Sequence, residues 1–121
     1  MACAVTREMI EEFYDLLSTQ DLAGLEAALI PEAVLLFPKT QPLNCREKIL
    51  KFFRLLFRQY PQLTFKVRRS VIQDGWAAVH WTNDGFTRKK EAYCNEGVTL
   101  IEFKEGKVSF LSDFFKNTEV F

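Results

Sequence analysis

One acidic side chain stands in an apolar stretch near the end of the chain. Asp113 follows the run Val108 to Ser112, so we expect it to be buried, and a buried carboxylate must be paired, hydrogen-bonded or protonated. Poor solvation raises the pKa of a carboxyl group, which suits acid–base catalysis or ligand binding. The alternative is a structural acid held by Tyr14, Asn95 or backbone donors. Asp113 is the first candidate for a catalytic residue.

His80 is the only histidine and the second candidate for proton transfer, because an unperturbed imidazole titrates near neutral pH. A lone histidine on a strand is more often a structural side chain than a proton shuttle. Neighbouring residues of a strand point to opposite faces, so only one of His80 and Trp81 can face a pocket. A bulge that shifts this strand by one residue would reverse the assignment.

The segments that must position these side chains begin with two helices. Apolar residues repeat at i, i+3, i+4 and i+7 from Ile10 to Leu17, with Thr6 available as N-cap. A second, short helix is expected from Asp21 to Leu29. We expect Pro31 to close it, because proline lacks the N–H that the next turn would need.

A third helix is expected after a short buried segment, residues 33–37, which is either a strand or a turn. Asn44 and Glu47 form a capping-box pattern at the start of this helix, and Tyr60-Pro61 ends it. Its residues 49–57 carry a wide apolar face that can cover a sheet.

The second half of the chain changes to the alternation of β-strands. Strands are expected at residues 63–71, 76–82, 91–104 and 107–116, and tight turns are expected at Asp74-Gly75 and Glu105-Gly106. Three helices followed by an antiparallel four-stranded meander indicate an α+β domain, with the helices on one face of a curved sheet.

Composition limits the classes of function. The 121 residues fit a single domain, 1–121, and the formal net charge of zero gives no positive field to gather nucleic acid. No apolar run is long enough to span a membrane. One histidine and three cysteines without metal-type spacing predict no metal site. We expect reduced thiols, a cytoplasmic location and no cofactor.

The closing segments resemble a known family. The stretch Tyr93 to Val108, with Asn95, Gly97-Val98 and Gly106-Lys107-Val108, followed by Ser112-Asp113-Phe114-Phe115, is similar to the final hairpin of SnoaL-like proteins of the nuclear-transport-factor-2-like (NTF2-like) superfamily. The segments 21–25 and 46–49 match the family's second and third helices. This resemblance implies a cystatin-like cone of three N-terminal helices packed on a strongly curved, mostly antiparallel sheet. It also implies a homodimer formed through the sheet face.

The family hosts several chemistries, which can be compared residue by residue. In the ketosteroid-isomerase register, Phe13, Phe37 and Thr99 stand where the catalytic residues would be, so steroid isomerisation is not expected. In the limonene-epoxide-hydrolase register Asp113 matches one of the two catalytic acids. Trp81 and Asn83 stand where the arginine and the second acid would be, so the two-carboxylate proton relay of that family is not expected. Polyketide cyclases pair a pocket histidine with a late Asp, as His80 and Asp113 would if both faced inward, whereas this register places Trp81 inward.

The resemblance and strand parity together predict the lining of a pocket around Asp113. The expected ligand-contacting residues are Tyr14, Phe37, Phe57, Trp81, Asn83, Tyr93, Asn95, Thr99 and Phe115. The first hypothesis is a protein that binds an apolar or cyclic small molecule, with cofactor-free acid–base catalysis of isomerase, hydrolase or cyclase type. The alternative is a non-catalytic dimerisation or interaction module with a filled interior. A cavity of roughly 300 Å³ or more would favour the ligand.

Overall fold

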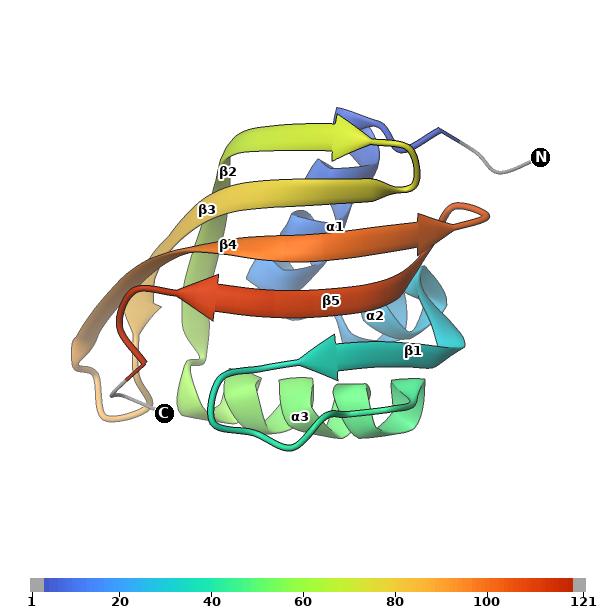
Figure 1. Cartoon of the computed structure of the whole chain (residues 1–121). Coiled ribbons are helices and arrows are strands. Elements are labelled where there is room, and N and C mark those ends of the chain that lie inside the picture. The colour runs from blue at the N-terminus through green and yellow to red at the C-terminus, as the bar shows by residue number, and fades with distance from the viewer. Residues whose placement is uncertain (1–3, 119–121) are drawn as a thin grey trace.

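A computed structural model describes residues 4–118 as three helices and a five-stranded sheet (Figure 1). The elements in chain order are α1 (Arg7–Thr19), α2 (Leu22–Ala28), β1 (Leu29–Leu36), α3 (Arg46–Gln59), β2 (Gln62–Gln73), β3 (Trp76–Phe86), β4 (Ala92–Lys104) and β5 (Lys107–Phe115). The strand order is β1-β5-β4-β3-β2, with β1 parallel to β5 and all other neighbours antiparallel. The predicted α+β cone with a mostly antiparallel sheet is confirmed.

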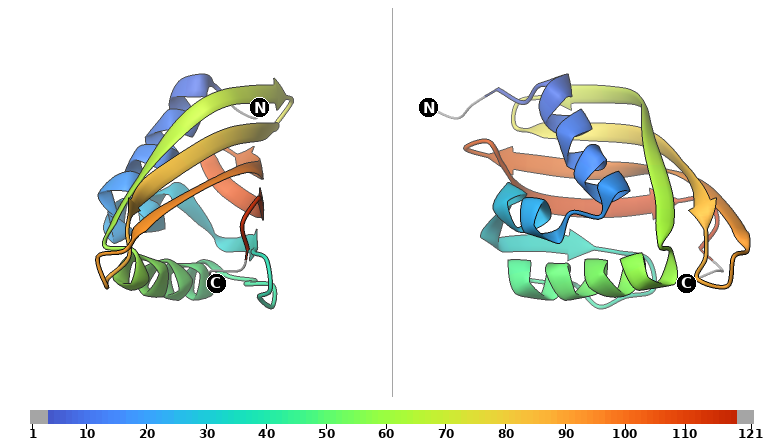
Figure 2. Two further views of the ribbon diagram at one scale, coloured as in Figure 1. Left: turned by 90° about the vertical axis from the view of Figure 1, so that its left-hand side faces the viewer. Right: turned by 180° about the vertical axis from the view of Figure 1, so that it is seen from behind.

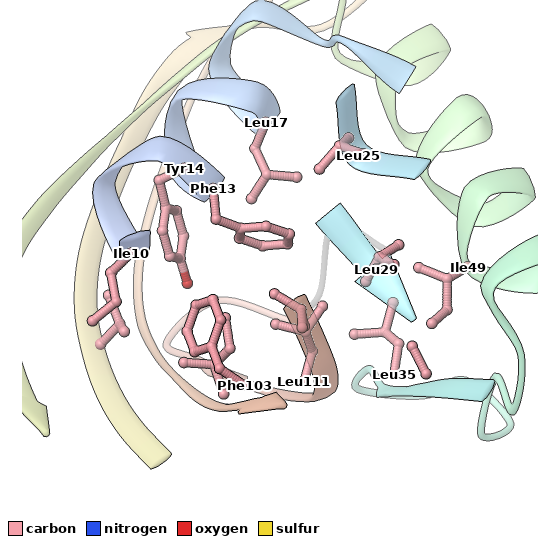
Figure 3. Packing of buried hydrophobic residues seen from close by; sticks show 14 of the residues in the cluster. Ile10, Phe13, Tyr14, Leu17, Leu25, Leu29, Leu35, Ile49, Phe103 and Leu111 are labelled. Carbon is pink, nitrogen blue, oxygen red and sulfur yellow. The ribbon is translucent and has the colours of Figure 1, made fainter. Parts of the chain in front are cut away.

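Helix α1 forms where the apolar spacing predicts it. Thr6 caps it by accepting a 3.2 Å hydrogen bond from the Met9 N–H, and Gln20 ends it in a left-handed conformation. Its buried side chains enter the core between the sheet and α2, where Figure 3 shows them facing Leu111 of β5. These side chains are Ile10, Phe13, Tyr14 and Leu17.

Two predicted helix boundaries are wrong. Pro31 does not close α2; it lies within β1, which is an edge strand, and the register of β1 against β5 shifts between Leu29 and Val34. An edge strand tolerates proline because one side of its backbone needs no partner strand. At α3 the N-cap is Cys45, not Asn44, and no side chain caps this helix. The helix still forms because its apolar face is buried at Ile49, Phe53 and Phe57.

The meander has the two tight turns that were predicted, but a fifth strand adds to it. The chain turns at Asp74-Gly75 and Glu105-Gly106, with positive φ at Asp74, Glu105 and Gly106. β1 runs beside β5 in parallel, a pairing that requires the intervening chain to cross over, so no local pattern announces it. The sequence analysis left residues 33–37 open as a strand or a turn, and most of this segment belongs to the fifth strand, β1.

The sheet bends strongly, and α1 and α3 lie on its concave side (Figure 2). In β2 the register shifts between Val67 and Arg69, so Arg68 is the extra residue of a bulge. The register of β3 against β4 has no shift. β3 therefore keeps a strict alternation of inward and outward side chains, which decides what enters the core.

Gly97 shows how closely the concave face is packed. A Cβ atom at this position would lie 2.4 Å from the Phe114 carbonyl oxygen, 2.7 Å from Phe115 Cβ and 2.7 Å from Trp81 Cζ2. Real Cβ atoms do not approach other atoms so closely, so any larger side chain must push the backbone of β5 away. Glycine at position 97 gives the Trp81 ring its place on the sheet.

We expect Gly97→Ala to lower the free energy of unfolding by about 1–3 kcal/mol, because the added methyl group collides with backbone that cannot move freely. Urea denaturation of wild type and variant measures the difference. The control is Gly106→Asn, since nothing lies within 4 Å of a Cβ at Gly106 and Asn tolerates its φ of 81°. Equal losses in the two variants would contradict this account of the packing.

Candidate active site

A pocket opens on the concave side of the sheet, between α1 and α3. The sheet contributes its floor through β3, β4 and β5, while α1 and α3 contribute its apolar roof. Its lining residues are Phe13, Tyr14, Leu17, Leu35, Phe37, Phe53, Leu56, Leu63, Phe65, Trp81, Asn83, Tyr93, Asn95, Thr99, Leu111, Asp113 and Phe115. The cavity volume is about 50 Å³, so most of the space is filled by side chains.

A chain of hydrogen bonds ends at Asp113. The Trp81 Nε1–H donates to Thr99 Oγ1 over 2.8 Å, and the Thr99 hydroxyl donates to Asp113 Oδ1 over 2.6 Å. The indole nitrogen can only donate, so the hydroxyl proton of Thr99 is directed to the carboxylate. Asp113 and Thr99 are directly opposite each other on β5 and β4, which fixes the short distance. The chain of hydrogen bonds therefore holds one of the two carboxyl oxygens, Oδ1.

Asp113 is poised to exchange a proton near neutral pH. Burial among apolar side chains raises its pKa from 3.8 to about 6, and the hydrogen bond from Thr99 opposes part of that rise. The residue keeps some accessible surface and lines the narrow apolar pocket. At neutral pH the carboxylate is mainly ionised and can accept a proton from a bound compound.

Tyr14 adds a neutral hydroxyl at the same end of the pocket. Its side chain is buried, and burial raises its pKa well above the ordinary value. The nearby charge of Asp113 adds to this rise, and a side-chain hydrogen bond with Thr99 opposes it. The hydroxyl therefore stays protonated throughout the physiological range. It can donate a hydrogen bond to a ligand oxygen on which negative charge develops.

A second polar group lies farther along β3 and β4. Asn83 and Asn95 are opposite each other in the register. The Asn95 amide nitrogen donates to the Tyr93 hydroxyl over 3.0 Å and to the Asn117 carbonyl over 2.8 Å. Burial raises the pKa of Tyr93 to about 12, so its hydroxyl is also neutral. Asn83 is 6% exposed, and its Oδ1 is buried with no hydrogen-bond partner.

Nearly all of the residues predicted to contact a ligand lie along this pocket. They are Tyr14, Phe37, Trp81, Asn83, Tyr93, Asn95, Thr99 and Phe115, together with Asp113. Phe57 does not line it: its ring stacks on Phe53 at 6.0 Å between centroids and packs into the core. The helical stripe of α3 is wide enough to serve both pocket and core, so spacing alone could not separate the two.

His80 lies on the opposite face of the sheet, which corrects the comparison in which it would share a pocket with Asp113. Its Nε2 is 2.6 Å from Glu96 Oε2, and the Lys116 ammonium donates to Glu96 Oε1 over 3.0 Å. The hydrogen bonds from His80 and Lys116 lower the pKa of Glu96. The physical reason is that the bulge lies in β2, so the alternation of β3 turns Trp81 inward and His80 outward.

The structure adds lining residues that the sequence analysis did not select. They are Phe13, Leu17, Leu35, Phe53, Leu56, Leu63, Phe65 and Leu111. The alternation of β2 placed Leu63 and Phe65 on one face, and this pattern could have identified them as lining residues. The Phe65 ring lies 5.8 Å from Tyr14 and 5.4 Å from Trp81 between centroids, so it joins α1 to the floor of the pocket.

Two general features of residues 4–118 bear on function. No group of three or more His, Cys, Asp or Glu side chains gathers there in a way that could hold a metal ion. None of the helices in this described part has the length and apolar character needed to cross a membrane. Cys45 and Cys94 are free thiols, whereas Cys3 lies outside the described residues.

Comparison with known proteins places this fold and pocket in a family. The model of the SnoaL-like domain matches residues 10–110, and the chain belongs to the SnoaL-like family. A search of curated proteins finds no match. Solved structures share the fold at low sequence identity.

Three of these structures illustrate the range. An NTF2-like protein of unknown function from Burkholderia pseudomallei has a TM-score of 0.82 and 17% identity, covering 93% of this chain and 92% of that one. A candidate SnoaL-like polyketide cyclase from Jannaschia has a TM-score of 0.80 and 18% identity, and the match covers 90% of this chain and 83% of that one. An LEH-like epoxide hydrolase of M. tuberculosis has a TM-score of 0.78 and 15% identity, and the match covers 90% of this chain and 80% of that one. The TM-scores establish that the fold is shared, and the low identities leave the reaction open.

The raised pKa of Asp113 predicts how stability depends on pH. The folded protein binds this proton more tightly than the unfolded chain does, so this group's contribution to stability falls as the pH rises from the ordinary value of 3.8 to about 6. The total decline is at most about 3 kcal/mol. We expect Asp113→Asn to lack the decline and to be more stable than wild type at pH 7.

Urea denaturation between pH 4 and pH 7 measures both curves. The control is Asp84→Asn, because Asp84 is exposed on β3 and its replacement should leave the wild-type decline in place. Parallel curves for wild type and Asp113→Asn would show that the Asp113 carboxyl is well solvated.

Proposed function

We propose that this protein binds a small cyclic, mainly apolar compound in the concave pocket and transfers a proton to or from it without a cofactor. The observation that carries the proposal is Asp113, whose burial raises its pKa to about 6 at the end of an apolar pocket. Asp113 is the proton acceptor, and Tyr14 is the neutral donor for a developing oxyanion. Proton removal from a carbon next to a carbonyl group is the simplest reaction these two groups support.

The small cavity restricts how a ligand can bind. A volume of about 50 Å³ holds water molecules but is below the roughly 300 Å³ expected of a pocket for a drug-sized molecule. A ring compound must therefore displace side chains. Phe37, Leu56 and Phe115 are partly exposed and are the lining residues best able to move outward. The ligand is consequently a small compound of one or two rings.

The proposal includes a cytoplasmic location. It is supported by the free thiols of Cys45 and Cys94, of which Cys94 is exposed. Exposed thiols persist where the surroundings are reducing.

We expect small aromatic ketones, with acetophenone and 1-tetralone as probes, to bind the wild type and to exchange the hydrogens next to their carbonyl for deuterium in D₂O. Proton NMR follows the exchange, and ligand-observed NMR follows binding. Asp113→Asn should reduce the exchange rate at least about 100-fold, because general-base catalysis contributes that much or more. The matched control, Asp84→Asn, changes an exposed acid outside the pocket and should retain the wild-type rate. Binding of neither ketone would count against the proposal.

The second candidate function is the non-catalytic dimerisation module, which a different observation favours. The outer face of the sheet carries an apolar cluster of five side chains, one from β3 and four from β4 and β5: Trp76, Val98, Leu100, Phe110 and Phe114. Phe114 is 58% exposed and Trp76 41% exposed. Exposed apolar patches of this kind mark interaction sites. We propose that two copies pair through this outer cluster.

We expect the wild type to sediment as a dimer at micromolar concentration and Phe114→Lys to sediment as a monomer, because a charge within the outer cluster cannot be buried unpaired. Leu55→Lys is the control: Leu55 is 60% exposed but lies on α3, away from the outer face. A monomeric wild type would contradict the pairing. Pairing and ligand binding are compatible, since they use opposite faces of one sheet.

A further inference from the structure

Asn83 has an unmet hydrogen bond in the lining of the pocket. The residue is 6% exposed, and its Oδ1 is shielded from solvent with no partner. Buried polar atoms in folded proteins are nearly always hydrogen-bonded, and an exception calls for an explanation. A ligand that displaces lining side chains, as the small cavity requires, can bring a donor to this buried acceptor.

The other amide and indole N–H groups in the lining are already used. Both hydrogens of the Asn95 amide are directed elsewhere, to the Tyr93 hydroxyl and to the Asn117 carbonyl. The Trp81 N–H donates to Thr99. The Asn95 amide cannot turn toward Asn83 without losing these bonds, because its Oδ1 also accepts from the Glu96 and Asn117 N–H groups.

Asn83 and Asp113 mark different ends of the pocket. In the register Asn83 is opposite Asn95, whereas Asp113 is opposite Thr99, and Thr99 lies four positions after Asn95 on β4. This corresponds to about 13 Å of extended backbone, shortened across the concave side by the bend of the sheet. Gly97 lies midway, opposite both Trp81 and Phe115, so aromatic rings form the floor between the two polar ends.

We propose that the compound bound here carries a hydroxyl or N–H donor at the end remote from its reacting group, and that Asn83 Oδ1 accepts this donor. The inference rests on the proposed function, because it assumes that the reacting group lies at Asp113. A ring stacked on the aromatic floor joins the two polar ends. The substrate class is therefore a hydroxylated or amino-substituted ring carbonyl compound.

An unpartnered acceptor also explains how the pocket selects its ligand. A compound that brings a donor to Asn83 satisfies an atom that is unpaired in the free protein, while an apolar analogue of the same shape leaves it unpaired. A site that hydrogen-bonds a substrate group discriminates strongly against the analogue that lacks it. Asn83 is accordingly a specificity-determining residue.

The test uses two probes of nearly equal shape, 4-hydroxyacetophenone and 4-methylacetophenone, with wild type and Asn83→Leu. We expect the wild type to bind the hydroxyl compound at least about tenfold more tightly. In Asn83→Leu the difference should fall to within about twofold, or favour the methyl compound. Dissociation constants from NMR titration give the comparison.

The Tm of the ligand-free protein gives a second readout. Asn83→Leu should raise the Tm by a few degrees, because it removes a buried acceptor that has no partner. Asn95→Leu, the matched control at the opposite position of the register, should lower the Tm because it removes four hydrogen bonds. A lower Tm for Asn83→Leu would show that the Asn83 amide is satisfied within the protein and would overturn the inference.

The two proposals fail in different ways. If neither probe binds the wild type, the proposed binding function fails, and the inference fails with it. If both probes bind wild type and Asn83→Leu with the same ratio of affinities, the pocket binds ketones but Asn83 does not select them, and only the inference is overturned.

Discussion

The hydrogen-bond chain from Trp81 through Thr99 to Asp113 is the interaction around which the concave face is organised. It requires three neighbouring strands in one register, an indole ring packed closely against Gly97, and a threonine hydroxyl that accepts from the indole and donates to the carboxylate. Each requirement is met by backbone pairing, so the carboxylate is held by the sheet itself. The helices then cover it with apolar side chains and make its charged form costly.

The same bent sheet supports two different uses of apolar surface. Its concave side collects aromatic rings around Asp113, and its outer side carries the cluster from Trp76 to Phe114. Strand alternation assigns every residue to one side or the other, which is why His80 is hydrogen-bonded to Glu96 on the outer face while its neighbour Trp81 belongs to the pocket. Binding and pairing can thus change independently.

Family membership and site chemistry answer different questions. Proteins with the same cone include an LEH-like epoxide hydrolase and a candidate polyketide cyclase, at 15% and 18% identity. What this chain can do depends on the few polar groups in its cone. One acid, one tyrosine hydroxyl and an unpaired asparagine oxygen are the groups on which the proposed proton transfer and the proposed ligand with two polar ends rest. The restricted cavity limits that compound to a small ring system.

The sequence by itself determined the helices, the two tight turns, the alternation of the meander strands and the position of Asp113 in an apolar strand, because these depend on local spacing and backbone preference. Tertiary structure alone decided three matters. β1 pairs with β5 across some eighty residues of chain, so Pro31 lies in an edge strand and does not end a helix. The bulge lies in β2 and not in β3, so β3 keeps its regular alternation and the His80 side chain points outward. The Asn83 oxygen has no partner, because the Asn95 amide opposite it donates to other groups, including the Asn117 carbonyl near the end of the chain. Such contacts join residues far apart in the sequence, so local sequence patterns do not predict them.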